Sequence, residues 1–391
     1  MKSSNISQYD KMTKTPVEPL IVTLSIPTIM SMLITQVYNL VDTAFVGTLG
    51  NSASGAVGIV FGFMALLQAI AFMFGQGAGS ISSRALGQKN VEEASKTSST
   101  GFFWSFAFAL IMAVICFIIL DPLVYFLGST KTIAPYAKIY IGYILAIAPF
   151  FVSSLSLNNL LRYEGKAFFG MIGLMTGAIL NIFGDWLLIV VLKMGISGAG
   201  LSTAISQVVS FVILLWAFLT GKTSAKLKLR YVSFKPNDVL NIMATGFPSM
   251  LRQGLNSAAT IVLNSVAAVY GDVAVAAFSI VNRISFFTFS LAIGIGQGLQ
   301  PVAAFNYGAG KYSRVRKAFK SAFIFAEAMM LIVNTIVLVM AGSMIGIFRD
   351  DMDVIRIGAS ALRYQCYSTY LLPYCMVTEM EIGRASCRER V

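Results

Sequence analysis

The chain has 391 residues, of which 57% are hydrophobic and only 12% are charged, whereas a soluble domain carries about 25% charged residues. The formal net charge is +12, but the basic residues gather in short segments between apolar stretches and form no recognition motif, which argues against a nucleic-acid-binding protein. Histidine is absent and the four cysteines form no C-x-x-C pair, so neither a zinc site nor a disulfide framework is supported.

Apolar segments long enough to cross a bilayer recur along the chain with short polar breaks. The first set of predicted helices covers residues 18–47, 53–83, 100–127, 136–161, 168–192 and 197–220. After a basic stretch, the second set covers residues 244–269, 274–306, 318–348 and 356–380. We therefore predict an all-α polytopic membrane protein in which residues 1–220 form an N-lobe, residues 221–243 a cytoplasmic linker and residues 244–380 a C-lobe.

The two sets of helices repeat each other at an offset of 221 residues. Residues 50–87 lie over residues 271–308 without a gap, and ten of the 38 pairs are identical. The register extends back to Pro27 and Pro248. Self-similarity at so long a period in so apolar a chain indicates two membrane half-bundles, and in transporters built this way the substrate site lies between the repeats.

Basic residues predict the orientation in the membrane. They concentrate in the N-terminal segment and in residues 84–96, 162–166, 221–243 and 311–320, whereas the alternate loops carry fewer of them. All these segments fall on one side, here called the basic end, so the positive-inside rule places the N-terminus in the cytoplasm. Because six helices precede the linker, both lobes enter the membrane with the same orientation, which is a parallel repeat.

The second copy of the repeat is predicted to be incomplete. Six helices after residue 221 would extend to about residue 441, but the sequence stops at residue 391, so about ten helices are expected in all. The last eleven residues, 381–391, turn polar and basic in mid-helix and resemble a translated sequencing adapter. We therefore expect a C-terminally truncated C-lobe followed by a non-native tail, and we leave the tail out of the fold prediction.

Asp42 is the strongest candidate for a functional residue. An ionisable side chain in a spanning helix costs at least about 2.5–3.5 kcal/mol at the centre of the bilayer, so its presence suggests a function. Gln36, Asn39 and Asp42 follow one another at intervals of three residues, which predicts one polar stripe facing the bundle interior. The structural alternative is an aspartate that merely lies near the outer helix end, since Gly47 and Gly50 close this helix.

A second acid lies in the same lobe. Asp185 follows Asn181 by four residues in another apolar helix, so the two side chains share a helix face. An interhelical hydrogen bond is the structural alternative for Asp185. Two acids embedded in apolar helices of one lobe suggest a shared site that exchanges protons. In the C-lobe, Arg283 is predicted either to line the cavity between the lobes or to neutralise an acid.

Several motifs resemble those of the multidrug and toxic compound extrusion (MATE) family, closest to its bacterial DinF-like or MepA-like branch. They are P-x14-D-T-x2-V-G-x2-G from Pro27 to Gly50, LRYEG at 161–165, N-x3-D at Asn181 and Asp185, and GISGAGLSTAISQ at 195–207. The resemblance covers residues 15–380. It implies twelve helices in two lobes and drug efflux driven by inward H⁺ or Na⁺. It also places Asp42, Asn181 and Asp185 on the family's N-lobe cation site.

The resemblance leads to a specific functional hypothesis. We expect an antiporter of the bacterial inner membrane that exports lipophilic or cationic drugs and toxins by alternating access, with H⁺ favoured over Na⁺ at Asp42 and Asp185. Protonation would rearrange the first helix by a bend at Pro27. Residues 244–269 contain no acid, so a C-lobe sodium site is not expected. Besides its coupling ion, the protein is expected to need no cofactor or resident metal.

Two alternatives remain open from the sequence. The same fold would serve a flippase of lipid-linked oligosaccharides or an exporter of organic anions that uses Arg283. An intramembrane enzyme is a remote alternative, because histidine, a metal motif and a paired nucleophile and base are all missing from the sequence. In each case we expect a small-molecule substrate, a lipid bilayer as the surroundings, no nucleic-acid partner and a monomer.

Overall fold

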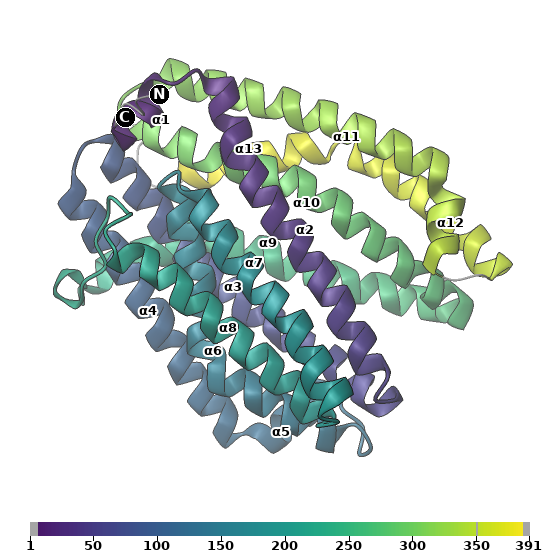
Figure 1. Ribbon diagram of the computed structural model, residues 1–391. Coiled ribbons are helices and arrows are strands. Elements are labelled where there is room, and N and C mark those ends of the chain that lie inside the picture. Colours follow the sequence, from purple (N-terminus) through teal and green to yellow (C-terminus); the bar gives the residue numbers. More distant parts are fainter. Residues whose placement is uncertain (1–6, 349–350, 386–391) are drawn as a thin grey trace.

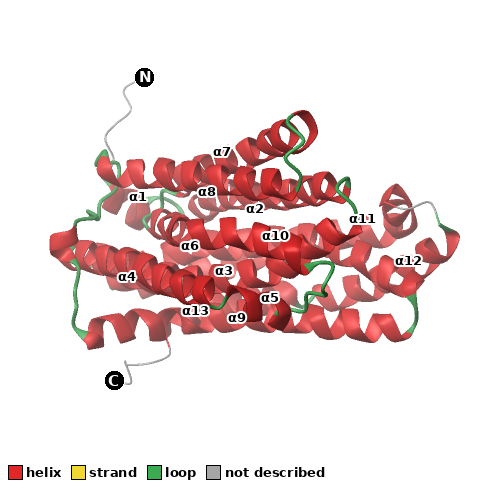
Figure 2. Ribbon diagram, turned by 90° about the horizontal axis from the view of Figure 1, so that it is seen from below, coloured by secondary structure: helices red, strands yellow, loops and turns green. Residues whose placement is uncertain are grey.

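The computed structural model describes residues 7–348 and 351–385, and within these residues it contains helices, turns and loops but no strand (Figure 2). The N-lobe consists of α1 (Gln8–Lys14), α2 (Val17–Gly47), α3 (Asn51–Gly87), α4 (Val91–Ile118), α5 (Leu120–Phe126), α6 (Ala134–Tyr163), α7 (Ala167–Asp185), the π-helical η1 (Trp186–Val191) and α8 (Ile196–Leu219). The linker carries one 3₁₀ turn, η2 (Leu229–Tyr231), and the C-lobe consists of α9 (Pro236–Val269), α10 (Asp272–Gly308), α11 (Tyr312–Phe348), α12 (Met352–Thr369) and α13 (Leu372–Ala385). Eight helices within the described ranges are long and apolar enough to cross a membrane.

The ten predicted helices are present, and they differ from the prediction mainly at prolines and caps. α4 begins at Val91, because the Asn90 side chain accepts a hydrogen bond from the Glu93 amide at 3.0 Å and so caps a polar first turn. The predicted helix over 100–127 breaks before α5, where Pro122 lacks the amide proton that a continuous helix needs. Pro236 begins α9 well before residue 244, a favoured place for proline.

The predicted helix over 356–380 is also interrupted. α12 ends at Thr369 and α13 begins at Leu372, with Pro373 at its second position, where a missing amide proton costs nothing. In the N-lobe, Pro149 lies inside α6 and does not interrupt that helix. Residues 381–385 of the predicted tail belong to α13, and residues 386–391 lie outside the described part of the chain.

The offset of 221 residues holds for whole helices. α3 and α10 each contain 37 residues, and both their first and their last residues differ by 221. Gly50 and Gly271, which precede these two helices, both have a positive φ (105° and 91°), a conformation that glycine adopts without strain. The duplication seen in the sequence is therefore a duplication of helix lengths and turns.

The two lobes meet along a seam formed by α2 and α3 of the N-lobe and α9 and α10 of the C-lobe. Glycines allow these helices to approach closely. A Cβ atom at Gly246 of α9 would overlap the Met73 carbonyl oxygen of α3, and one at Gly298 of α10 would overlap the Ser25 hydroxyl of α2. Both contacts lie in the halves of the helices nearest the basic end.

At the opposite end the lobes separate. Figure 1 shows α10 and α11 diverging from α6 and α8 with distance from the end of the molecule where α1 lies. Gly58 and Gly62 of α3 and Gly254 of α9 have open space where a Cβ atom would project. The lobes therefore pack closely at the basic end, and their helices diverge toward the other end.

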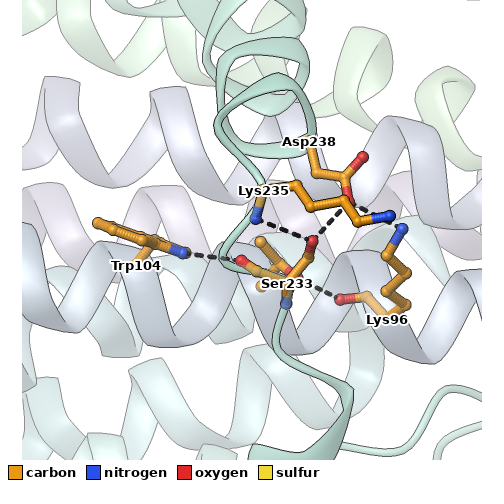
Figure 3. Close-up of polar contacts among 6 residues, drawn as sticks. Lys96, Trp104, Ser233, Lys235 and Asp238 are labelled. Atoms are coloured by element: carbon orange, nitrogen blue, oxygen red, sulfur yellow. Dashed lines mark hydrogen bonds and ion pairs between the residues drawn. The ribbon is translucent and has the colours of Figure 1, made fainter.

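The linker is bound along α4 by hydrogen bonds. The amides of Lys226 and Lys228 donate to the hydroxyls of Ser95 and Ser99, at 3.0 and 3.2 Å. Farther along, the Ser233 amide donates to Thr100 Oγ1 at 2.9 Å, and Trp104 Nε1 donates to the Ser233 carbonyl oxygen at 3.2 Å (Figure 3). Side chains from three turns of α4 thus fix the linker to the N-lobe.

The linker ends at an ion pair where α9 begins. Lys96 of α4 lies 2.8 Å from Asp238, whose carboxylate also accepts a hydrogen bond from Ser233 Oγ (Figure 3). A surface pocket of about 870 Å³ lies beside this contact, lined by residues 90–96 and 230–236. It is at the basic end, outside the space between the lobes.

Candidate functional site

Two carboxyl groups lie close together inside the N-lobe. Asp42 of α2 is 3% exposed and Asp185, the last residue of α7, is fully buried. Their carboxyl groups contact each other directly, because α2 and α7 pack side by side. The structure thus brings together the two acids that the sequence places in separate helices.

Asn181 completes the site with a hydroxyl pair from α8. Its Nδ2 lies 3.3 Å from Ser202 Oγ and 3.4 Å from Thr203 Oγ1, and Ser202 Oγ donates to the Asn181 carbonyl oxygen at 3.0 Å. The fully buried Tyr140 of α6 reaches Thr203 with its hydroxyl. Ser202 and Thr203 belong to the motif at 195–207, but the sequence did not assign them to the site. Tyr140 was not predicted.

The site has more acceptors than donors. Asp42 Oδ1, both carboxylate oxygens of Asp185 and Asn181 Oδ1 are buried and accept no hydrogen bond of ordinary geometry within the described part of the chain, although the Ser202 hydroxyl lies close to Asp185. Buried polar atoms are normally paired, and an unpaired one costs about 1–3 kcal/mol. Oxygen atoms from carboxyl and amide groups suit a proton or a hard cation. Among the described residues no group of three or more His, Cys, Asp or Glu side chains could hold a metal ion.

The backbone changes its helix type directly after Asp185. The α-helix ends at Asp185, and the π-helical η1 follows directly, with the Leu192 amide bonded to the Leu187 carbonyl oxygen at 2.9 Å. Such wide turns inside a helix often occur at functional sites. Gly184 lets α7 pack closely on α8, since a Cβ atom there would lie 2.5 Å from Ser202 Oγ.

The rest of the predicted polar stripe faces a different neighbour. Gln36 and Asn39 are half-buried, and their side chains form no hydrogen bond with any described residue. Gln36 lies seven residues after Ile29, which packs against Gly294 of α10, so it is on the seam face of α2 rather than the face of Asp42. Pro27 lies inside α2, which remains one helix from Val17 to Gly47.

Arg283 lies in the half of α10 farther from the basic end. It is exposed and forms no ion pair among the described residues. It precedes Gly294 by eleven residues, three helical turns, so it shares the face of α10 that packs against α2 nearer the basic end. The side chain therefore belongs where the lobes have separated, and in this conformation it neutralises no acid.

The acid of α2 is not repeated in the C-lobe. Leu263 occupies the position of α9 that corresponds to Asp42, and it is 45% exposed. The helices α2 and α9 therefore correspond in the repeat, but the carboxyl group of Asp42 does not.

A third buried acid lies outside the spanning helices, in the turn between α6 and α7. The Glu164 carboxylate accepts hydrogen bonds from the amides of Ser224 and Ala225 in the linker, at 2.7 and 3.1 Å. Burial raises the pKa of Glu164 from its usual 4.5 to about 7, although the two amide bonds act in the opposite direction. Glu164 thus anchors the first part of the linker to the N-lobe.

We expect Glu164→Gln to remove part of the pH dependence of stability. Between pH 4.5 and about 7 the folded protein holds a proton on Glu164 that the unfolded chain has lost. Wild-type stability therefore falls as the pH rises through this window, by roughly 3 kcal/mol from this residue. Thermal unfolding in detergent at about pH 5 and about pH 8 should show a smaller fall for the variant. Glu92→Gln, at an exposed position of α4, should keep the wild-type fall, and equal falls for Glu164→Gln and wild type would contradict the assignment.

Comparison with known proteins gives a consistent result. The family model MatE matches residues 27–187 and 248–380. The multidrug export protein MepA of Staphylococcus saprophyticus is 26% identical over 348 residues, which cover 89% of this chain and 77% of the relative. MepA of Staphylococcus aureus is also 26% identical, over 95% of this chain and 82% of its own length.

A solved structure agrees over almost the whole chain. It is described as the outward-facing conformation of a multidrug resistance MATE family transporter of the MOP superfamily. It superposes with a TM-score of 0.89 at 27% sequence identity and covers 98% of this chain and 86% of that chain.

Proposed function

Because this chain belongs to the MATE family, we propose that it is a cation-coupled antiporter that exports lipophilic and cationic compounds across the bacterial inner membrane. Its relatives are exporters, and the chain is a transporter rather than an enzyme. The observation that carries the proposal is the buried contact between Asp42 and Asp185, beside the space between two lobes that are closed at one end only.

The coupling ion that the site favours is H⁺. Two adjacent carboxylates in a dry interior repel each other, and one shared proton relieves the repulsion without any further ligand. Na⁺ would have to exchange its hydration shell for the unpaired oxygens of Asp42, Asp185 and Asn181. These oxygens accept no hydrogen bond of ordinary geometry, which supports a site that gains and loses a positive charge during the cycle.

The proposed cycle follows from the asymmetry of the structure. With the lobes open at the far end, a proton reaches Asp42 and Asp185 from outside and neutralises the site. α2 carries both Asp42 and the seam contact at Ser25, so a change at the acid pair bends α2 near Pro27 and alters the C-lobe contact. The substrate leaves, the lobes reorient, and the proton is released on the other side.

The orientation follows from the basic segments. Residues 84–96, 221–235 and 311–320 lie at the closed end of the molecule, which we place in the cytoplasm together with the N-terminus. In this orientation the open space between the lobes faces outward. We propose that the protein acts as a monomer, since one chain supplies both lobes and the acid pair.

The experiment that tests the function is uphill transport. Purified protein in liposomes, with a lipophilic cationic dye on both sides, should move the dye against its gradient when a pH gradient is imposed. A sodium gradient of equal size should drive less transport. If neither gradient drives uphill movement of any dye tested, the proposal fails.

A second candidate function is export of an organic anion or of a lipid-linked oligosaccharide. The exposed position of Arg283 on the wall of the open space favours this candidate. A single cation on that wall attracts anionic substrates and weakens the binding of cationic ones.

We therefore expect Arg283→Gln to change the preference of the transporter between cationic and anionic substrates. A unit charge at about 4 Å contributes about 1 kcal/mol even in water, which corresponds to roughly a fivefold change in rate. The ratio of cationic to anionic dye transport should rise by about this factor in the variant. Arg316→Gln, which removes an exposed charge at the start of α11, serves as the matched control. If the ratio stays the same, Arg283 does not face the substrate.

A further inference from the structure

One arginine is buried in the seam between the lobes. Arg162, in the last turn of α6, is 4% exposed, and its guanidinium donates hydrogen bonds to residues of both lobes. One terminal nitrogen donates to Gln297 Oε1, and the other donates to Asn159 Oδ1 and, at 3.3 Å, to Gln300 Oε1. Asn159 is on α6 itself, but Gln297 and Gln300 are on α10, so the guanidinium joins the N-lobe to the C-lobe.

The polar contact continues across the seam through neutral groups. Gln300 Nε2 lies 3.4 Å from Gln76 Oε1 of α3, and Ser249 Oγ of α9 donates to the same oxygen at 2.8 Å. Gln253 of α9 donates to Gln68 Oε1 of α3 at 3.1 Å. Through Gln300, Gln76 and Ser249, the helices α10, α3 and α9 form one chain of side-chain hydrogen bonds with Arg162, and Gln253 and Gln68 add a separate bond between α9 and α3.

The charge of Arg162 is not balanced locally. Within the described ranges every hydrogen-bond partner of its guanidinium is a neutral amide, and no ion pair includes it. Its Nε, Gln76 Nε2 and Gln297 Nε2 are also buried without a partner among these residues. A dry cation with neutral partners is costly, and water reaching the seam would remove that cost.

These opposing effects make the seam a two-state contact. When it is closed, charge-assisted hydrogen bonds hold α10 against α6. When it is open, the guanidinium and the amide groups are hydrated instead. An apolar side chain at residue 162 would leave the oxygens of Asn159, Gln297 and Gln300 without their donor in the closed seam, whereas an arginine is satisfied in both arrangements.

We propose that Arg162 is the positioning residue that latches the lobes together at the basic end and sets the balance between the closed and the open seam. This inference rests on the proposed function only for its role in the cycle, since alternation requires the seam to open. The latch itself is a statement about a conformational equilibrium, and it can be measured without transport.

The test measures how often the seam opens. Ser25 of α2 is buried and packs on Gly298 of α10, so a cysteine there reacts with a water-soluble maleimide only when the seam is open. The four native cysteines are replaced, Ser25→Cys is introduced into the full chain, and labelling is followed in inside-out membrane vesicles. We expect Arg162→Gln to raise the labelling rate roughly tenfold, because charge-assisted bonds across the seam are lost.

Further variants distinguish the ability of the Arg162 guanidinium to bond several acceptors from its positive charge. Arg162→Lys keeps the charge but cannot bond two acceptors in the same geometry, so its labelling rate should rise as well. Gln297→Ala combined with Gln300→Ala leaves Arg162 in place and removes its C-lobe partners, and this variant should behave like Arg162→Gln. Arg230→Gln, on the exposed linker, should leave the rate unchanged.

The proposal is overturned if Arg162→Gln and the double glutamine variant both label at or below the wild-type rate. If Arg162→Gln fails to accumulate in the membrane, the double glutamine variant decides the question alone. Absence of uphill transport together with the expected labelling pattern would reject the antiporter and leave the latch in place.

Discussion

Asp42→Asn is expected to abolish uphill transport while leaving the protein folded and able to bind its substrate. Asparagine has nearly the shape of the aspartate but carries no proton in exchange, so Asp185 loses the partner with which it shares one. A pH gradient should then drive no more dye movement in liposomes than liposomes without protein show. Dye binding and downhill exchange should persist, because neither requires an uptake of protons at Asp42.

The repeat supplies a matched control for this prediction. Leu263→Asn places the same new side chain at the equivalent position of α9. Leu263 is exposed, and residues 244–269 around it contain no acid. It should transport like the wild type, and Asp42→Glu should retain part of the activity. Uphill transport by Asp42→Asn at the wild-type rate would show that coupling does not pass through this carboxyl group.

Gly246→Ala is expected to prevent closure of the seam. The added methyl group would overlap the Met73 carbonyl oxygen, which belongs to the backbone of α3 and cannot rotate away. Overpacking of this kind costs about 1–3 kcal/mol or more, enough to shift a balanced two-state equilibrium about tenfold. Spin labels at the basic end of α3 and α9 should report a longer distance, and transport should fall because the outward-open state needs a closed seam.

Gly254→Ala is the control for Gly246→Ala, because both residues lie in α9 and both gain the same helix propensity. A Cβ atom at Gly254 meets open space, so this variant should keep the wild-type spin-label distance and gain up to about 1 kcal/mol in helix stability. If the two alanine variants show the same distances, close approach at Gly246 does not determine closure.

The parts of the fold that could be predicted are those with a long-range pattern. Apolar segments predicted ten helices, and the repeat predicted that α3 and α10 would correspond from end to end. The boundaries were less predictable, because local hydrogen bonds decide them. Asn90 extends α4 into residues polar enough to be read as a loop, and Pro373 divides a segment whose composition is uniformly helical.

The charged residues of the candidate site could be predicted from the sequence. Asp42 and Asp185 stand out because they are ionisable residues in apolar helices. Ser202, Thr203 and Tyr140 could not be assigned, since hydroxyl groups are common in such helices and only packing brings these three to the acids. Arg162 was read as part of a basic turn, but the structure places it in the last turn of α6 and buries it in the seam. Its sequence neighbours carry no sign of the glutamines that surround it, which come from a helix more than a hundred residues away.

The attachment of the linker to α4 has a mechanical consequence. Since the backbone of Lys226, Lys228 and Ser233 is bonded to side chains of α4, we expect this segment to move together with the N-lobe. The covalent connection between the lobes therefore has little slack, and its free part shortens to the few residues between Ser233 and the first turn of α9. We therefore expect the lobes to rotate about a point beside the Lys96–Asp238 ion pair, where a small rotation would displace the far end of the 34-residue α9 by a larger distance.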